Sequence, residues 1–230
     1  MDAWNIFCDF DGTISTTDVI DALLARHGMS GWEKLEEDWR AGRIGSRECM
    51  SGQVALLDMD HVEIGRFLDE AAIDPAFPAF IAEARRCAAP VQIVSDGLDY
   101  AISVILRRHG LSGLAVAANH LRRLDSRRWQ LDSPWQAAGC SSGTCKCACV
   151  ERSRSDGRKT LLIGDGASDF CAAGNVDFVF AKNRLIGYCR ANGIAHLPIA
   201  NFHEATALLP LLLSGALTTA ADSLPERAVA

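Results

Sequence analysis

The sequence predicts an α/β protein whose doubly wound parallel sheet is interrupted, after the first strand, by a wholly helical segment. From about residue 78 onward, short apolar runs alternate with amphipathic ones, which is typical of strands and helices in a parallel sheet. Three apolar runs end in polar turn sequences, and ligands bind at that end of parallel strands. These features predict a core domain of residues 1–15 and 78–213, a helical cap of 16–77 and a loose tail of 214–230.

The first elements follow from local pattern. Residues 4–8, WNIFC, are an apolar run before a turn and predict a buried strand. Residues 18–28 place apolar side chains at helical spacing and close on Gly28, a favourable helix terminator. Glu63 lies three residues after Asp60, the spacing of a capping box. Three more helices are therefore expected in the cap, with N-caps at Ser30, Ser46 and Asp60.

Strands and helices then alternate to the end of the core. Strands are expected at 90–97, 114–121, 159–166 and 176–181, with a polar hairpin over 122–131. Helices are expected at 77–89, 98–110 and 185–193, and another begins near 168. Such alternation favours a parallel sheet covered by helices.

The bulk composition restricts the partners. The 230 residues are 49% hydrophobic and 23% charged, as in ordinary globular proteins, and the formal charge of −6 argues against nucleic acid. No apolar run is long enough for a membrane span, and the first residues lack the pattern of a signal peptide. We therefore expect a cytoplasmic protein whose nine cysteines are thiols or metal ligands rather than disulfides.

Two carboxylates follow the first strand in CDFDGT. Asp9 can serve as a nucleophile or a metal ligand, and Asp11, two positions on, can donate or accept a proton beside it. Gly12 and Thr13 allow backbone N–H groups to turn toward an anion. The alternative is a turn in which an aspartate side chain only caps the loop.

Two further strands end in polar residues. Ser95 offers a hydroxyl to a phosphate, beside Asp96 and the turn residue Gly97, although a serine there can equally be an N-cap. Asp165 and Asp169, in GDGASD, place carboxylates around a strand-to-helix turn, and such oxygens suit Mg²⁺. A turn with a cap is again the alternative.

A cysteine-rich segment, CSSGTCKCAC, contains Lys146. In a polar loop, this lysine can neutralise a phosphate as a point charge or simply be solvated. Two other lysines compete for the role, Lys159 and Lys182. The spacing of the four cysteines is denser than in paired zinc knuckles, so a structural metal and packed thiols both stay open. These cysteines are Cys140, Cys145, Cys147 and Cys149.

The order of these motifs along the chain resembles the haloacid dehalogenase-like (HAD) phosphatases. That resemblance implies a Rossmannoid core with a helical cap, as in the subgroup that contains phosphoserine phosphatase. It implies that Asp9 attacks phosphorus and that Asp11 protonates the leaving oxygen and then activates water. It also implies that the Asp9 carboxylate, the backbone carbonyl of Asp11 and the Asp165 carboxylate bind Mg²⁺. Asp169 is then either a further ligand or a residue that contacts a ligand. The implied phosphate-binding residues are Gly12, Thr13, Ser95, Asp96, Gly97 and Lys146.

Longer stretches narrow the resemblance. CDFDGTISTTDVID, ANHL, the cysteine-rich segment and AHLPIANF are similar to the methionine-salvage phosphatases that act on 2-hydroxy-3-keto-5-methylthiopentenyl-1-phosphate. Asp18 stands where phosphoserine phosphatases carry a glutamate that contacts the substrate amine, and it is equally an N-cap candidate.

The expected activity is Mg²⁺-dependent hydrolysis of a small phosphorylated metabolite through an aspartyl-phosphate. Phosphoserine hydrolysis, phosphotransfer and ligand binding without catalysis are the alternatives. The sequence leaves the oligomeric state open.

Overall fold

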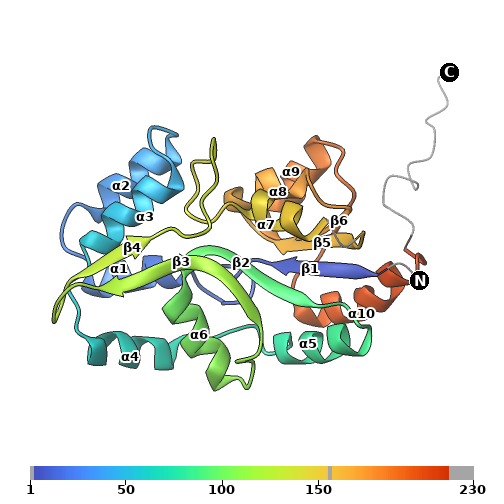
Figure 1. Cartoon of the computed structure of the whole chain (residues 1–230), viewed down its shortest axis with the longest axis horizontal. Coiled ribbons are helices and arrows are strands. Elements are labelled where there is room, and N and C mark those ends of the chain that lie inside the picture. Colours follow the sequence, from blue (N-terminus) through green and yellow to red (C-terminus); the bar gives the residue numbers. More distant parts are fainter. Residues whose placement is uncertain (1–2, 155–156, 218–230) are drawn as a thin grey trace.

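The computed structural model describes residues 3–154 and 157–217. Within these ranges the strands form one seven-stranded sheet in the order β4-β3-β2-β1-β5-β6-β7, with only β4 antiparallel to its neighbour (Figure 1). β1 (Trp4–Cys8) lies in the centre, between β2 (Val91–Leu98) and β5 (Lys159–Gly164). The remaining strands are β3 (Ala115–Arg123), β4 (Trp129–Asp132), β6 (Phe178–Ala181) and β7 (His196–Pro198). The predicted fold class is confirmed.

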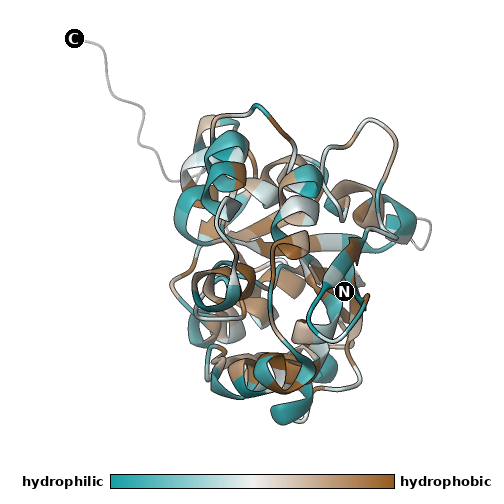
Figure 2. Cartoon of the chain, turned by 90° about the vertical axis from the view of Figure 1, so that its left-hand side faces the viewer, coloured by the Kyte–Doolittle hydropathy of each residue, from teal (hydrophilic) through white to brown (hydrophobic). Residues whose placement is uncertain are grey.

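Helices cover both faces of the sheet. One face carries α4 (His61–Glu70), α5 (Phe77–Arg86), α6 (Asp99–Arg108) and α10 (Phe202–Leu213) (Figure 1). The other carries α7 (Lys146–Ser153), α8 (Phe170–Ala173) and α9 (Asn183–Ala191). Alternate β1 side chains point to opposite faces, so Ile6 packs in one apolar cluster and Phe7 in the other. Burial on both sides explains why this strand is apolar apart from Asn5. Figure 2 shows apolar ribbon in the sheet and on helices that pack against it.

The segment between β1 and α5 is helical, as predicted. It contains α1 (Val19–His27), α2 (Trp32–Arg40), α3 (Ser46–Ala55) and α4. α2 and α3 stand together near β4, whereas α4 lies beside α6 under the sheet (Figure 1). Buried residues of α1, α3 and α4, such as Leu23, Val54 and Leu68, belong to the same apolar cluster as the sheet. The division into a core and a cap of residues 16–77 stays a prediction.

One of the three expected helix caps is confirmed. The Asp60 carboxylate accepts from the N–H groups of Val62 and Glu63, and Glu63 accepts in return from the Asp60 N–H. The expected caps at Ser30 and Ser46 are wrong. α2 begins after Gly31, which has the left-handed φ of 107°, and the hydroxyl of Ser46 lies inside the first turn of α3, where it donates to a carboxylate instead.

The sequence analysis missed three elements. The segment around Lys146 was expected to be a loop, but α7 begins at Lys146 itself. β7 and α10 were not recognised, and α10 completes one helical layer through contacts of Phe202 with Phe77 and Phe80. Of the predicted tail, residues 218–230 lie outside the described residues. None of the helices in the described ranges combines the length and apolar character that a membrane crossing requires.

The expectation that every cysteine is a thiol or a metal ligand is wrong for one pair. A disulfide joins Cys147 of α7 to Cys171 of α8, whose Cα atoms lie 6.4 Å apart. The two helices pack on the same face of the sheet, which brings the residues within disulfide range. Cys140, Cys145 and Cys149 are free, and no cysteine of the described residues belongs to a group of three potential metal ligands. With Cys147 in this disulfide, the four cysteines of the segment do not form one site of four thiolates.

Candidate active site

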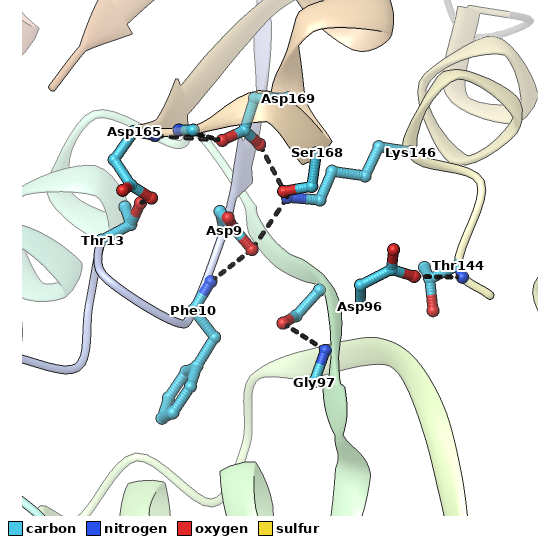
Figure 3. Close-up of polar contacts among 12 residues, drawn as sticks. Asp9, Phe10, Thr13, Asp96, Gly97, Thr144, Lys146, Asp165, Ser168 and Asp169 are labelled. Atoms are coloured by element: carbon cyan, nitrogen blue, oxygen red, sulfur yellow. Dashed lines mark hydrogen bonds and ion pairs between the residues drawn. The ribbon is translucent and has the colours of Figure 1, made fainter. Parts of the chain in front are cut away.

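Polar side chains converge at the carboxyl edge of the sheet. Because β1, β2 and β5 run parallel, Asp9, Ser95 and Asp165 come to the same edge and line one pocket of about 650 Å³. Figure 3 shows the polar contacts at the floor of this pocket. We call Asp9, Lys146, Asp165 and Asp169 the strand-tip cluster.

Asp9 is only 4% exposed, directly after β1. Its Oδ1 accepts from the Phe10 N–H and from the Lys146 ammonium, both at 2.8 Å, whereas its Oδ2 has no partner among the described residues (Figure 3). Burial raises the pKa of Asp9; the Lys146 charge opposes this rise, and the Asp169 charge adds to it. One oxygen is therefore fixed, while the other is left for a ligand or an electrophile.

Lys146 is 3% exposed and ties two strand tips together. Besides Asp9, its Nζ contacts Asp169 Oδ1 at 2.7 Å and Ser168 Oγ at 3.1 Å. Burial alone would lower the pKa of Lys146, but the carboxylates of Asp169 and Asp9 outweigh burial and raise that pKa. The ammonium therefore stays charged beside Asp9.

The two rival lysines lie elsewhere. Lys182 donates to the backbone carbonyl of Thr13 at 2.9 Å. Lys159 opens β5 at the opposite end of the sheet, 5.6 Å from the centre of the Trp4 ring. The geometry thus brings Lys146, rather than either rival, to the nucleophile candidate.

Asp165 and Asp169 have different surroundings. Asp169 is fully buried, and its Oδ2 accepts from the N–H groups of Asp165 and Gly166 at 3.0 and 3.1 Å. Asp165 is less buried, and its Oδ1 accepts from the Thr13 hydroxyl at 2.9 Å. Carboxylate oxygens of Asp9, Asp165 and Asp169 all lie within 4.8 Å of one another. Thr13, expected to face a phosphate, uses its hydroxyl to orient Asp165.

Asp11 lies beside Asp9 and is held from the helical side. Its Oδ1 accepts from the Val19 N–H, in the first turn of α1, at 2.9 Å. Burial raises the pKa of Asp11 to about 6. A Cβ at Gly97 would overlap Asp11 Oδ2, and one at Gly12 would lie 2.8 Å from Asp165 Oδ2. Both glycines therefore leave room for the carboxylates.

Ser95 and Asp96, near the end of β2, have different partners. Ser95 is buried, and its Oγ accepts from the Gly97 N–H at 2.9 Å, which leaves the hydroxyl hydrogen for a ligand. The carboxylate of Asp96 is engaged by other protein groups. Its Oδ1 accepts from the Thr144 N–H at 2.6 Å and its Oδ2 from the Ser46 hydroxyl at 2.7 Å. The expected phosphate contact of Asp96 stays a prediction.

Asp18 fits the N-cap alternative. Its Oδ1 accepts from the Asp21 N–H at 3.0 Å at the start of α1. It also lines the pocket, so the substrate contact stays a prediction.

The sequence analysis did not identify the wall of the pocket opposite the strand tips. Gln53 is buried there, and its Nε2 donates to Glu36 Oε2 at 3.2 Å. Helical spacing was the only signal for these residues, because no motif marks them. We call the pocket-lining residues of α1, α2 and α3 the helical wall: Ile20, Asp21, Glu36, Trp39, Arg40, Ser46, Cys49, Met50 and Gln53.

Comparison with known proteins places the chain in a family. The family model of haloacid dehalogenase-like hydrolases matches residues 6–174, which include every residue of the strand-tip cluster. The chain belongs to the haloacid dehalogenase-like hydrolases.

Two curated relatives of this hydrolase are both named 2-hydroxy-3-keto-5-methylthiopentenyl-1-phosphate phosphatase. The protein of Lysinibacillus sphaericus is 28% identical over 217 residues, covering 90% of this chain and 94% of the relative. That of Bacillus velezensis is 30% identical over 204 residues, covering 86% of each. The prediction of a phosphatase of this superfamily is confirmed.

Among solved structures, this HAD hydrolase is similar to a phospho-aspartyl intermediate analogue of phosphoserine phosphatase. The TM-score is 0.70 at 18% identity, covering 91% of this chain and 99% of the other. At that identity the likeness shows the fold alone.

Proposed function

We propose that this HAD phosphatase is an Mg²⁺-dependent phosphomonoesterase that transfers the phosphoryl group of a small metabolite to Asp9 and then to water. One observation carries the proposal: the buried Asp9 has Oδ1 fixed by Phe10 and Lys146, while Oδ2 has no partner among the described residues. A carboxylate with one oxygen anchored and one available is arranged for in-line attack.

The donor set fits a magnesium ion. Three carboxylates, from Asp9, Asp165 and Asp169, face the single ammonium of Lys146, and burial raises the pKa of Asp9 and Asp165. A divalent cation would offset this excess of negative charge, and hard oxygen donors select Mg²⁺. Asp9, Asp165 and the carbonyl of Asp11 are the proposed ligands. Bound Mg²⁺ would neutralise charge on the phosphate and the nucleophile.

Asp169 has a different proposed role. Its Oδ1 contacts Lys146 and its Oδ2 accepts two backbone N–H groups, and, unlike Asp9 and Asp165, Asp169 does not line the pocket. We assign it the orientation of Lys146 and of the loop that carries Asp165, rather than direct metal binding.

The chemistry proceeds in two displacements. In the first, Asp9 Oδ2 forms a bond to phosphorus, the bond from phosphorus to the ester oxygen breaks, and Asp11 gives its proton to that leaving oxygen. In the second, Asp11 accepts a proton from water as the water oxygen attacks phosphorus, and the bond to Asp9 breaks. Lys146 and Ser95 hold the phosphoryl oxygens, and the charge of Lys146 stabilises the transition state. The products are an alcohol and inorganic phosphate.

The proposed substrate is 2-hydroxy-3-keto-5-methylthiopentenyl-1-phosphate, which the curated relatives are named for. Ile20, Trp39 and Met50 give the helical wall an apolar part suited to a thioether chain. Phosphoserine is the second candidate, because Asp21 and Glu36 of the same wall offer carboxylates to an ammonium group. A cytoplasmic location remains part of the proposal.

Steady-state kinetics on both candidates and on p-nitrophenyl phosphate test the proposal. With Mg²⁺ present, we expect hydrolysis of all three at different efficiencies, with the methylthio substrate preferred. Chelation with EDTA should abolish turnover and added Mg²⁺ should restore it, because the proposed ligands are hard oxygens.

Asp165→Asn should raise the Mg²⁺ concentration for half-maximal activity at least tenfold. The matched control is Asp132→Asn, because Asp132 is a solvent-accessible carboxylate on β4, outside the pocket. Full activity after exhaustive chelation would remove the metal from the proposal.

A further inference from the structure

Asp96 connects three parts of the chain that are distant in sequence. It lies at the tip of β2, and its carboxylate accepts from Ser46 at the start of α3 and from the Thr144 N–H, two residues before Lys146. Its own carbonyl accepts from the Nδ2 of Asn119, on β3, at 2.5 Å. In Figure 3 the carboxylate of Asp96 points toward Thr144 rather than toward Asp9.

The segment that leads into Lys146 is packed against the same partners. The Arg47 N–H donates to the Ser141 carbonyl at 3.0 Å, and a Cβ at Gly45 would lie 2.6 Å from the Cβ of Ser141. The start of α3 therefore touches this segment twice, directly at Ser141 and through Asp96 at Thr144.

The β3 side of the same segment is also filled. The Asn119 side chain accepts from the Ser133 hydroxyl at 2.8 Å, and a Cβ at Gly143 would overlap that side chain. Residues 141–145, which we call the lysine loop, thus lie between α3 and β3 with little free space. A displacement of Asp96 would move the lysine loop, and with it Lys146.

Neighbouring residues of β2 have different partners around the same pocket. The Ser95 hydroxyl accepts from the Gly97 N–H, whereas the Asp96 carboxylate binds α3 and the lysine loop. Ser46, Cys49 and Met50 of α3 line the same pocket as Asp96. A substrate that contacts α3 is therefore linked to Lys146 through the hydrogen bonds of Asp96 with Ser46 and Thr144.

We propose that Asp96 is a positioning residue that couples the substrate-facing helix α3 to Lys146. It binds the lysine loop through the Thr144 N–H and α3 through Ser46, so that the ammonium is set at Asp9 when α3 is in place. The inference rests on the proposed phosphatase activity for its kinetic part, and on the hydrogen bonds alone for its structural part.

Two variants of Asp96 separate this role from others. Asp96→Ala removes both hydrogen bonds and leaves the Thr144 N–H unpaired, so we expect kcat to fall about 10- to 100-fold. Asp96→Asn can still accept from Thr144 and donate to the Ser46 oxygen, so kcat should stay within about threefold of the wild type. The control, Asp132→Ala, removes a carboxylate outside the pocket.

Hydrogen exchange of the backbone amides, read by mass spectrometry, supplies the structural readout. Exchange in residues 141–145 should rise at least about tenfold in Asp96→Ala and stay near the wild type in Asp96→Asn and Asp132→Ala. Ser46→Ala removes only the hydrogen bond between α3 and Asp96. It replaces Asp96→Ala as the test variant if Asp96→Ala does not fold. It should raise exchange both in residues 46–50 and in the lysine loop, and raise KM severalfold.

Several results would overturn the assignment. One is an Asp96→Ala protein whose exchange and kcat match those of Asp132→Ala; another is an Asp96→Asn protein as impaired as Asp96→Ala. Tighter inhibition of Asp96→Ala by inorganic phosphate would show that the carboxylate faces the phosphate instead. If the wild type hydrolyses no phosphate ester, the proposed function fails, but the exchange measurements still decide whether Asp96 holds the lysine loop to α3.

Discussion

Asp9 and Asp165 of the strand-tip cluster line the same pocket as the helical wall, but the cluster and the wall are built differently. In the cluster, Lys146 is buried and contacts Asp9, Asp169 and Ser168 at once. In the wall, α2 contributes no buried residue at all, and its pocket-lining Arg40 is 68% exposed in its ion pair with Glu36. The chemical groups are thus fixed at the edge of the sheet, whereas the helical wall combines buried residues of α1 and α3, such as Ile20 and Gln53, with the exposed helix α2.

This difference predicts different mutational responses. Exposed ion pairs contribute little, roughly 0–1 kcal/mol, because water screens them and ordering the side chains costs entropy. The buried cluster cannot lose one partner without leaving another buried charge unpaired. Changes in the cluster should therefore act on kcat by orders of magnitude, and changes in the wall should act mainly on KM and on substrate preference.

The largest contrast is expected among three lysines. Lys146→Ala should lower kcat/KM by roughly 10²–10³-fold, because a buried charge beside the nucleophile is lost from the transition state. Lys182→Ala, which frees the Thr13 carbonyl, should cost less, and Lys159→Ala should be near the wild type.

Kinetics of the three variants on one aryl phosphate make the comparison. A Lys146→Ala enzyme near the wild type, with Lys182→Ala impaired by orders of magnitude, would transfer the role to Lys182.

A smaller effect concerns pH. The pKa of Asp11 is raised to about 6 by burial, and the first displacement needs Asp11 protonated. The protonated fraction falls tenfold per pH unit above that value, so kcat/KM for an alkyl phosphate should decline as pH rises above about 6. p-Nitrophenyl phosphate, whose leaving group needs no proton, should show a flatter profile. Parallel profiles for the two substrates, or an unchanged profile in Asp11→Asn, would contradict this role.

The smallest effect is expected far from the pocket. Asp60→Ala removes the capping box of α4 and should destabilise the protein by about 1 kcal/mol, while kcat should not change, because α4 lies under the sheet. Ser30→Ala should change stability by less than about 0.5 kcal/mol, since Gly31 is the N-cap of α2 and no side chain caps that helix. Thermal unfolding of the two variants measures the difference, and equal losses would mean that Ser30 does cap α2.

The buried central strands could be predicted from the sequence, whereas α7 and β7 could not. Residue periodicity and turn residues located β1, β2 and β5, because a strand buried on both faces is a mainly apolar run that is followed by a polar turn. α7 was missed because its residues, KCACVERS, carry few apolar side chains, and its burial comes from packing against the sheet. β7 has three residues, too few for a periodic signal.

The candidate site was predictable only in part for a related reason. Asp9, Asp11 and Asp165 follow strands and Ser95 lies in the last half of β2, so their convergence could be inferred from parallel topology. The orientation of Asp96 could not be inferred, because its partners Ser46 and Thr144 are 50 and 48 residues away in sequence. The helical wall had no motif, since many apolar side chains at helical spacing give the same pattern.

The central claim, covalent transfer to Asp9, is tested most directly by trapping the acyl phosphate. Wild type and Asp11→Asn are mixed with Mg²⁺ and p-nitrophenyl phosphate, whose leaving group needs no proton from Asp11. The reactions are quenched in acid, reduced with borohydride and mapped by peptide mass spectrometry. Reduction converts a phosphorylated aspartate to homoserine, so the account predicts homoserine at position 9 only when substrate is present, and more of it in Asp11→Asn, where the second displacement lacks its base. Unmodified Asp9 in both proteins, together with appreciable turnover by a folded Asp9→Asn variant, would contradict the covalent mechanism.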